Sequence, residues 1–120
     1  NKFCLQACMN KPLTVWKTAI EQQRPYLSLN DFNRSIQHII NKNLFENNIY
    51  NILSHNKQVK EIIEIINQKK STQIQYVDHP IMNQLSYKIS NKKFCDTNFR
   101  FQSNLEDDIY DSENKKYKTY

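Results

Sequence analysis

Apolar residues recur along the chain with two spacings, one typical of amphipathic helices and one typical of short strands. Asn10-Lys11-Pro12 and Pro80 interrupt these runs, and the polar stretch over residues 17–23 is expected to be a loop. In chain order, the pattern predicts a helix at residues 2–9, strands at 13–16 and 26–29, a helix carrying Phe32 to Leu44, a strand at 49–53, a helix carrying Val59 to Ile66 and a strand at 74–77.

The pattern weakens after Pro80. Residues 85–89 alternate and are expected to be extended, while residues 91–95 and 105–110 are expected to form short helical turns. Residues 112–120 are polar without periodicity, which is typical of a frayed tail. One region over residues 1–111 followed by a tail at 112–120 is therefore the expected organisation.

Strands that alternate with helices predict an α/β fold with a small mixed or mainly parallel sheet and two main helices. A parallel sheet is normally covered by helices on both faces. Two helices are too few to cover both faces of such a sheet, so the pattern indicates that a partner segment is missing. The chain does not begin with Met and is expected to begin inside a longer protein.

Asparagine is expected to serve the turns and helix starts, because the chain contains no glycine. Asn30 or Asp31 is expected to cap the helix that carries Phe32, and Asn56 the helix that carries Val59. Asparagine also tolerates the left-handed backbone region better than most residues. Left-handed turns are expected at Asn10, Asn43, Asn48 and Asn98.

The net charge of +5 has two readings, an anionic partner or a lysine-rich solvated surface. The second is preferred, because lysine is abundant throughout the chain. No apolar run approaches the length of a membrane span, and the first residues lack a signal-peptide pattern. The odd number of cysteines predicts no disulfide framework, which makes a reducing cytoplasm the expected compartment.

Residues that could bind a metal or act in acid–base catalysis are few. Cys4 and Cys8 have helical i, i+4 spacing, but packing of reduced thiols is preferred over a metal site that would need four ligands. His38 is expected to be exposed, and His79 is a weak candidate for acid–base chemistry. Without glycine there is no phosphate-binding loop, and no Tyr-x-x-x-Lys pair is present. No catalytic and no metal-binding residue is therefore expected.

The cluster Gln23-Arg24-Pro25-Tyr26 is the first candidate binding site. Arginine at the entry to a strand can present its planar fork to a phosphate or a carboxylate. Pro25 biases Arg24 toward an extended backbone, and Tyr26 can add a hydroxyl donor or a stacking face. The alternative is a surface arginine packed over the tyrosine ring, and the chemistry alone does not separate the two.

The second candidate is Met82-Asn83-Gln84-Leu85-Ser86-Tyr87, which follows a strand and Pro80. Loops after strands often carry function. The side chains of Asn83, Gln84, Ser86 and Tyr87 could form a neutral hydrogen-bonding rim around a polyol. An ordinary polar loop is the alternative, and on the residues alone it is preferred.

Around these clusters the sequence resembles the C-terminal part of extended short-chain dehydrogenase/reductases, in the NAD-dependent epimerase/dehydratase family. The matching stretches follow in the family's order and cover most of residues 3–110. They are KPLTVWKTAIEQQRPYLSLNDFNRSI, IYNILSHNKQVKEII and VDHPIMNQLSYKISNKKF.

The resemblance implies substrate-binding roles for particular residues. Arg24 would contact the diphosphate of a nucleotide-diphosphate sugar, with Tyr26 beside the same pocket. Val15 and Trp16 would lie near the nucleotide base, and the segment from Asn83 to Tyr87 would close over the substrate. The expected substrate-binding residues are therefore Arg24, Tyr26, Trp16, Gln84 and Tyr87.

The resemblance also implies what the rest of the enzyme supplies. NAD would be bound by a missing N-terminal Rossmann half, which would also carry the catalytic Tyr-Lys pair, and the resemblance allows a homodimer of the intact parent. The chain alone is not expected to be active. Two departures stand out: relatives carry a second phosphate-binding arginine in the later segment, and an apolar final helix in place of residues 112–116.

Two other functions remain open. One is a stand-alone basic module that binds nucleic acid or another acidic partner, although no basic stripe interleaved with aromatic residues supports nucleic acid. The other is a non-catalytic remnant with a structural role. No membrane partner is expected.

Overall fold

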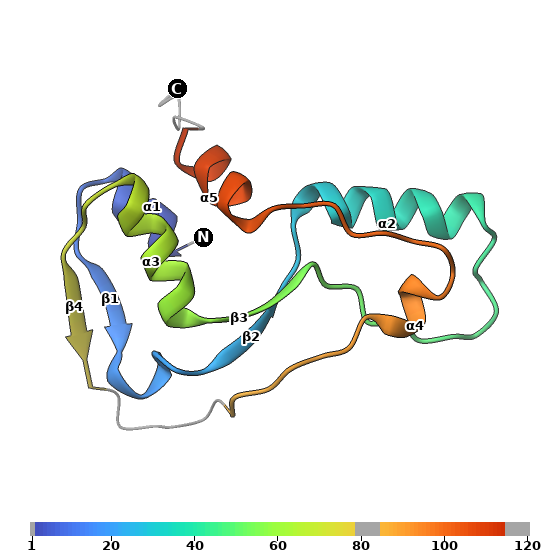
Figure 1. Ribbon diagram of the computed structural model, residues 1–120, viewed down its shortest axis with the longest axis horizontal. Helices are drawn as coiled ribbons and strands as arrows, with labels where there is room; N and C mark the ends of the chain where they lie inside the picture. Colours follow the sequence, from blue (N-terminus) through green and yellow to red (C-terminus); the bar gives the residue numbers. More distant parts are fainter. Residues whose placement is uncertain (1, 79–84, 115–120) are drawn as a thin grey trace.

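The computed structural model describes residues 2–78 and 85–114 (Figure 1). Helices lie at both ends of an elongated arrangement, one pair of strands lies at the end that holds α1 and α3, and a second pair runs between the two ends. In chain order the elements are α1 (Lys2–Cys8), β1 (Leu13–Trp16), the 3-10 turn η1 (Lys17–Ala19), β2 (Gln23–Tyr26), α2 (Leu29–Asn41), β3 (His55–Gln58), α3 (Val59–Lys69), β4 (Ile74–Val77), α4 (Lys92–Cys95) and α5 (Leu105–Asn114).

The strands of the described residues pair in both senses. β1 and β4 are parallel, with Leu13 opposite Ile74. β2 and β3 are antiparallel, with Tyr26 opposite His55. The predicted α/β class with a small mixed set of strands is therefore confirmed, and the strands form two separate two-stranded sheets.

The main core lies between β1 and the helices α1, α3 and α5. Its buried side chains include the apolar face predicted for α3, because that face packs directly onto β1 and α1. Ile66 is fully buried, and Ile62 and Ile63 are nearly so. The core residues are Cys4, Ala7, Leu13, Val15, Ile62, Ile63, Ile66 and Ile109.

A smaller aromatic core lies between α2 and α4. Phe94 is fully buried and lies 4.8 Å from Phe99 between ring centroids. His38 also packs here, with its ring 5.2 Å from that of Phe99 and its Nε2 2.9 Å from Thr97 Oγ1. The expectation that His38 is exposed is wrong, because it lies on the side of α2 that faces these aromatic rings.

The predicted strand over residues 49–53 is absent, and β3 begins at His55 instead. Backbone carbonyls in the predicted stretch are used by side chains rather than by a neighbouring strand. Asn91 donates to the Leu53 carbonyl at 2.8 Å, and Lys93 donates to the Ile49 carbonyl at 3.1 Å. The apolar run therefore lies outside the sheet, although its residues favour strands.

The other boundary errors lie around β2 and α2. β2 occupies Gln23–Tyr26 rather than 26–29, and η1 occupies part of the predicted loop. Ser28, not Asn30 or Asp31, caps α2 by accepting a hydrogen bond from the Asn30 amide at 3.2 Å. The chain therefore enters α2 directly after a short β2.

The start of α3 also differs from the expectation. Gln58 rather than Asn56 precedes the helix, and its amide donates to the Glu61 carboxylate at 2.7 Å. Asn56 lies within β3, where its side chain instead bonds both backbone groups of Ile89.

Asparagine replaces glycine at the left-handed turns of the described residues. Three of the predicted positions have positive φ angles, Asn10 at 54°, Asn43 at 52° and Asn98 at 69°. The fourth left-handed residue is Asn47, one position before the predicted Asn48.

The last described element, α5, runs to Asn114 and thus beyond Tyr110, where the sequence pattern ended it. Gln84 and His79 lie outside the described residues. Within residues 2–78 and 85–114, each helix is too short or too polar to cross a membrane.

Candidate functional site

The described part of the second candidate cluster, residues 85–87, lies beside the first cluster. The Gln23 amide donates to Ser86 Oγ at 2.9 Å, and the Tyr87 amide donates to the Gln23 carbonyl at 3.3 Å. The segment from Leu85 to Tyr87 therefore runs along the start of β2. This contact joins parts of the chain that are far apart in the sequence.

The guanidinium of Arg24 is held at the centre of this contact. Its Nη1 donates to the carbonyls of Gln23 at 2.8 Å and Leu85 at 2.7 Å, and its Nη2 donates to Gln22 Oε1 at 2.7 Å. Its Cζ lies 5.2 Å from the ring centroid of Tyr87. Together these three oxygens and the ring fix the orientation of the guanidinium.

The packing interpretation of Arg24 is realised in a changed form. The arginine packs over a tyrosine ring, but the ring is that of Tyr87 rather than that of Tyr26. The structure therefore brings together Arg24 and Tyr87 out of the five residues expected to bind substrate.

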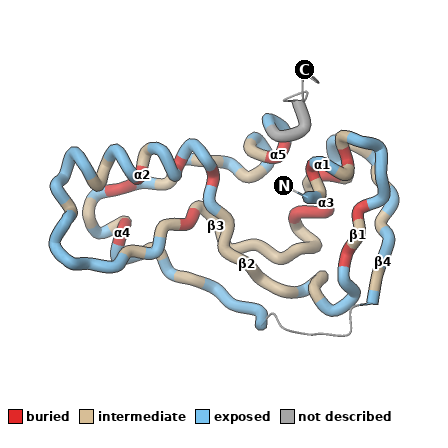
Figure 2. Tube along the Cα trace, turned by 180° about the vertical axis from the view of Figure 1, so that it is seen from behind, coloured by how far each residue is buried: buried red, intermediate tan, exposed pale blue. Residues whose placement is uncertain are grey.

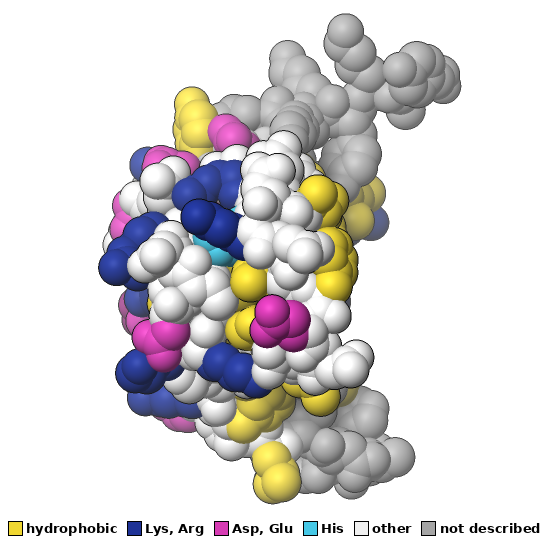
Figure 3. Space-filling model, turned by 90° about the vertical axis from the view of Figure 1, so that its right-hand side faces the viewer, with side chains coloured by type: hydrophobic (Ala, Val, Ile, Leu, Met, Phe, Trp, Pro, Cys, Tyr) yellow, Lys and Arg dark blue, Asp and Glu magenta, His cyan; other side chains and the backbone are white. Residues whose placement is uncertain are grey.

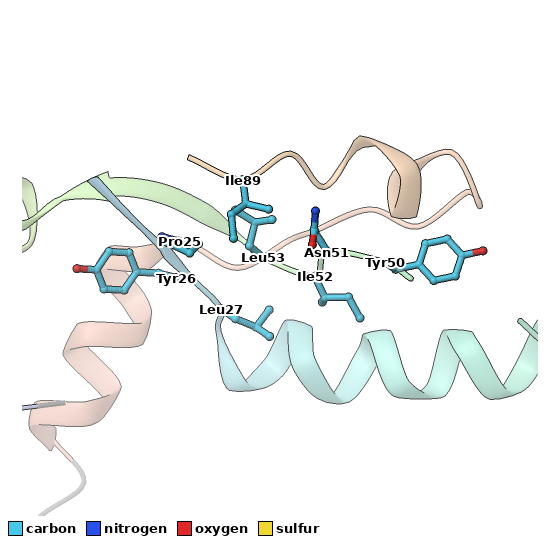
Figure 4. Close-up of a pocket in the computed structure, with 8 residues that line it drawn as sticks. All are labelled: Pro25, Tyr26, Leu27, Tyr50, Asn51, Ile52, Leu53 and Ile89. Atoms are coloured by element: carbon cyan, nitrogen blue, oxygen red, sulfur yellow. The ribbon is translucent and has the colours of Figure 1, made fainter. Parts of the chain in front are cut away.

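Tyr26 points toward a different part of the molecule. In Figure 4 its ring extends away from Pro25 and Ile89 toward α5. Burial raises the pKa of the Tyr26 hydroxyl, and the nearby charge of Arg24 partly opposes this effect. The hydroxyl is therefore protonated at neutral pH and able to donate a hydrogen bond.

Trp16 is the last residue of β1, opposite Val77 of β4, and it is partly exposed. η1 connects it to β2, so the ends of β1 and β4 and the beginning of β2 lie at the same edge of the fold (Figure 1). Trp16 therefore lies at the edge that also carries Arg24, but on the other sheet.

A hollow of about 250 Å³ adjoins β2 on the side of Ile89 (Figure 4). Its walls come from Pro25 to Leu27, from the irregular segment 50–53 and from Ile89. Asn51 is among the residues that line it and donates to the Ser90 carbonyl at 3.3 Å. Sequence reasoning missed this hollow, because it assigned residues 49–53 to a strand.

Asp31 is a charged residue of α2 that is fully buried. Its carboxylate accepts hydrogen bonds from Ser54 Oγ at 2.8 Å, Arg34 Nη1 at 2.7 Å and the amides of Gln102 and Ser103, both at 3.1 Å. Burial alone would raise the pKa of Asp31, but the hydrogen bonds from Gln102, Ser54 and Ser103 outweigh it and lower this pKa. Asp31 therefore joins α2 to two loops. The sequence analysis considered it only as a possible helix cap and did not predict this role.

A larger cavity, of about 490 Å³, lies between the first turn of α2 and the helices α1, α3 and α5. Its walls are mainly apolar, and its polar groups are Tyr26, Ser28, His55 and Asp108. Ser28 Oγ donates to Asp108 Oδ1 at 2.9 Å, and His55 Nε2 lies 2.9 Å from the Ser103 carbonyl. These contacts engage Ser28, Asp108 and His55, and the other lining residues except Tyr26 are apolar.

The described residues offer no cluster of three or more His, Cys, Asp or Glu side chains that could hold a metal ion. Cys4, Cys8 and Cys95 form no disulfide, and Cys4 is buried in the main core. The packing interpretation of Cys4 therefore agrees with its place in the fold.

Comparison with known proteins gives a fold rather than a family. No family model and no curated protein matches the sequence. Among solved structures, a partial consensus L-threonine 3-dehydrogenase matches with a TM-score of 0.74 and 19% identity, over 92% of this chain and 39% of that one. The complex of Thermus thermophilus UDP-glucose 4-epimerase with NAD matches with a TM-score of 0.72 and 17% identity, over 89% of this chain and 36% of that one.

The chain thus spans well under half the length of either solved structure. Because both identities are low, the match concerns the fold and not the individual site residues. The chain therefore has the fold of one part of the L-threonine 3-dehydrogenase and of the UDP-glucose 4-epimerase.

Proposed function

We propose that this chain is the substrate-side part of an NAD-dependent epimerase/dehydratase-type enzyme, and that it positions a nucleotide-diphosphate sugar. Its similarity to parts of two such enzymes supports the enzyme class. The observation that carries the substrate role is the fixed guanidinium of Arg24 beside Tyr87. A charged planar donor that is already oriented can bind a diphosphate without losing side-chain freedom on binding.

Positioning is the chemical contribution of such a site. Holding the diphosphate at one end fixes the sugar relative to a cofactor that is bound elsewhere, which lowers the entropic part of the barrier. Arg24 would pair with the diphosphate, and Tyr87 would hold Arg24. Trp16 and Gln84 remain proposed contacts to the base and the sugar.

The residues of this chain do not fit NAD itself. The chain contains no glycine, so no helix start offers the bare backbone that a dinucleotide's diphosphate approaches closely. When bound by the remaining part of the enzyme, NAD would accept and return a hydride. The proposal therefore assigns no redox step to the residues described here.

The test is binding of UDP-glucose by the chain and by its Arg24→Ala variant, measured by isothermal titration calorimetry. Loss of one charge-assisted contact should weaken binding by about 1.5–3 kcal/mol. Lys92→Ala is the matched control, since it also removes one positive charge but lies on α4 in an exposed pair with Asp96. Equal affinities of the Arg24→Ala variant and the parent chain would refute the substrate role.

One feature favours the rival function of a basic binding module. Arg34, His38 and Arg100 line an open hollow of about 410 Å³ together with several amide side chains. Binding of nucleic acid there would weaken steeply with salt, because phosphate contacts release counterions. Salt-dependent binding of single-stranded RNA that is lost in Arg100→Ala would favour this rival.

A further inference from the structure

The open hollow of about 410 Å³ beside α2, which we call the α2 hollow, differs in its chemistry from the other hollows described above. It lies between α2 and residues 98–102, a segment that runs along this helix (Figure 1). The described residues that line it include Arg34 and Arg100 and no carboxylate. The described linings of the hollow beside β2 and of the cavity between the core helices include no arginine.

A contact between α2 and this segment brings the two arginines together. Arg34 Nη2 donates to the Arg100 carbonyl at 3.0 Å, and Arg34 Nη1 donates to Asp31 Oδ1 at 2.7 Å. Its Cζ also lies 5.1 Å from the ring centroid of Phe99. The guanidinium of Arg34 is therefore oriented before any ligand binds, which lowers the entropic cost of binding.

The side chain of Arg100 is held much less. It is exposed, and its hydrogen bond to the described residues runs from Nη1 to the Phe99 carbonyl at 3.2 Å. A guanidinium carries several N–H donors, so most of those on Arg100 are available to a ligand. Because Asp31 balances the charge of Arg34, the charge of Arg100 is the net charge of these three groups.

Other groups at the α2 hollow are neutral. Exposed amide side chains can donate there, and they belong to Gln37, Asn41, Asn98 and Gln102. The end of α2 opposes an anion by about half an elementary charge, because the helix dipole is negative there. The amides of Lys42, Asn43 and Leu44 occupy carbonyls of this last turn. The balance of these effects is a positive site that is rich in donors.

The hollow is open to solvent at one end of the molecule. Most of α2 is exposed or half-buried (Figure 2). Figure 3 looks at the end where α2 stops and shows Lys and Arg side chains, with a histidine beside them and some Asp and Glu among them, on one side of this face. Hydrophobic side chains lie on the other side. The cationic part of this face is thus separate from its apolar part.

We propose that the α2 hollow binds a phosphate group carried by a small molecule. Donors that converge from two segments suit a tetrahedral oxyanion, whose oxygens point in several directions. A planar carboxylate needs only the paired N–H groups of one guanidinium. The volume of the hollow is within the range of roughly 300–1,000 Å³ that is typical of pockets for small ligands. This inference does not rest on the proposed function, because Arg24, Gln22 and residues 85–87 take no part in the hollow.

A nucleic-acid strand fits the hollow less well than a small molecule. Proteins that bind single strands stack bases on aromatic rings. Phe99, which lines the hollow, is only 4% exposed, and Arg34 lies over its ring. The hollow therefore lacks a ring on which a base could stack, whereas a phosphate group needs none.

The test is a proton–nitrogen NMR titration of the full 120-residue chain with sodium phosphate and with AMP. Sodium chloride at the same ionic strength is the control for charge screening. The expected result is saturable shifts of the guanidinium signals of Arg34 and Arg100 with both phosphate probes but not with chloride. Shifts confined to other residues, equal shifts with chloride, or no shifts overturn the proposal.

The same titration identifies the source of the phosphate. Tighter binding of AMP than of phosphate at the hollow would support the proposal with a phosphate ester as ligand, and equal affinities would support it with free phosphate. Binding of octauridylate there without binding of either small probe would overturn it in favour of nucleic acid.

A substitution ties the binding to Arg100. Arg100→Ala should weaken phosphate binding at least about tenfold, which is the loss expected for one charge-assisted hydrogen bond. Arg100→Gln keeps a donor for the Phe99 carbonyl and should show the same loss if Arg100→Ala does not fold. Lys60→Ala is the matched control, because it removes one positive charge on α3 from an exposed pair with Glu21. Undiminished binding in the folded Arg100 variants, or equal weakening in Lys60→Ala, would overturn the proposal.

Discussion

Cζ of Arg24 lies 5.2 Å from the ring centroid of Tyr87. The segment that carries this tyrosine also supplies the Leu85 carbonyl, which accepts a hydrogen bond from the same guanidinium. The arginine therefore depends on a second segment for its orientation. A change in that segment should alter binding at Arg24 without removing its charge.

Replacing Tyr87 should test this dependence. Tyr87→Leu removes the cation–π contact, which should weaken UDP-glucose binding by about 0.5–1 kcal/mol. Tyr87→Phe keeps the ring and should bind as the parent chain does. Calorimetric titration of both variants provides the comparison, and equal affinities in Tyr87→Leu and Tyr87→Phe would show that the ring does not matter.

Asp31 should be among the most costly side chains to remove. Asp31→Ala leaves the Ser54 hydroxyl and the amides of Gln102 and Ser103 without their acceptor, which should cost about 3 kcal/mol or more. Urea denaturation measures this loss in the free energy of unfolding. Asp96→Ala removes a carboxylate from an exposed pair and should change that free energy by under about 1 kcal/mol.

The lowered pKa of Asp31 makes stability depend on pH in a defined direction. A carboxyl whose pKa is lower in the folded chain stabilises the fold above its ordinary pKa of 3.8. This contribution is lost as the pH falls from that value through the lower pKa of the folded state. Denaturation curves at neutral pH and below about pH 4 should therefore differ less for Asp31→Asn than for the parent chain, and equal acid losses in both would contradict the assignment.

The two apolar faces of α2 and α3 should respond differently to the same substitution. Ile66→Ala in α3 should cost about 2–5 kcal/mol in the free energy of unfolding, because this side chain is fully buried. Ile36→Ala in α2 should cost under about 1 kcal/mol, because this side chain is already exposed. Thermal and urea unfolding of the two variants measure the difference. A large loss of free energy of unfolding in Ile36→Ala would show that the apolar side of α2 is buried within the chain.

The helices could be predicted from the sequence, but their orientation only in part. Periodicity located both α2 and α3 correctly. For α3 the apolar side is also the buried side, as Ile63 and Ile66 show. For α2 it is not, because periodicity identifies an apolar side without showing whether this chain or another polypeptide covers it.

β3 escaped prediction for a different reason. Its residues, His55-Asn56-Lys57-Gln58, are polar and lack strand propensity. They form a strand because the antiparallel register with β2 places them opposite Tyr26, Pro25, Arg24 and Gln23. Such tertiary pairing overrides local preference and leaves no local pattern.

The candidate site was predicted in its parts but not as a whole. The sequence singled out Arg24 and Tyr87 separately, and their contact follows from the path of residues 85–87 along β2. The role of Asp31 remained hidden, since its partners come from loops without a recognisable motif. Residue types can thus indicate candidate site residues, whereas tertiary contacts between segments decide which of them lie together.

The hydrogen bonds of Asp31 have a further consequence for α2, which concerns rotation about the helix axis. Apolar contacts have little directional preference, so a helix held by them alone could turn to cover Phe32 and Ile36. Hydrogen bonds depend strongly on angle, and any such turn would break those from Ser54, Gln102 and Ser103 at once. The buried carboxylate of Asp31 therefore resists rotation of α2 and favours the orientation in which its apolar side faces outward.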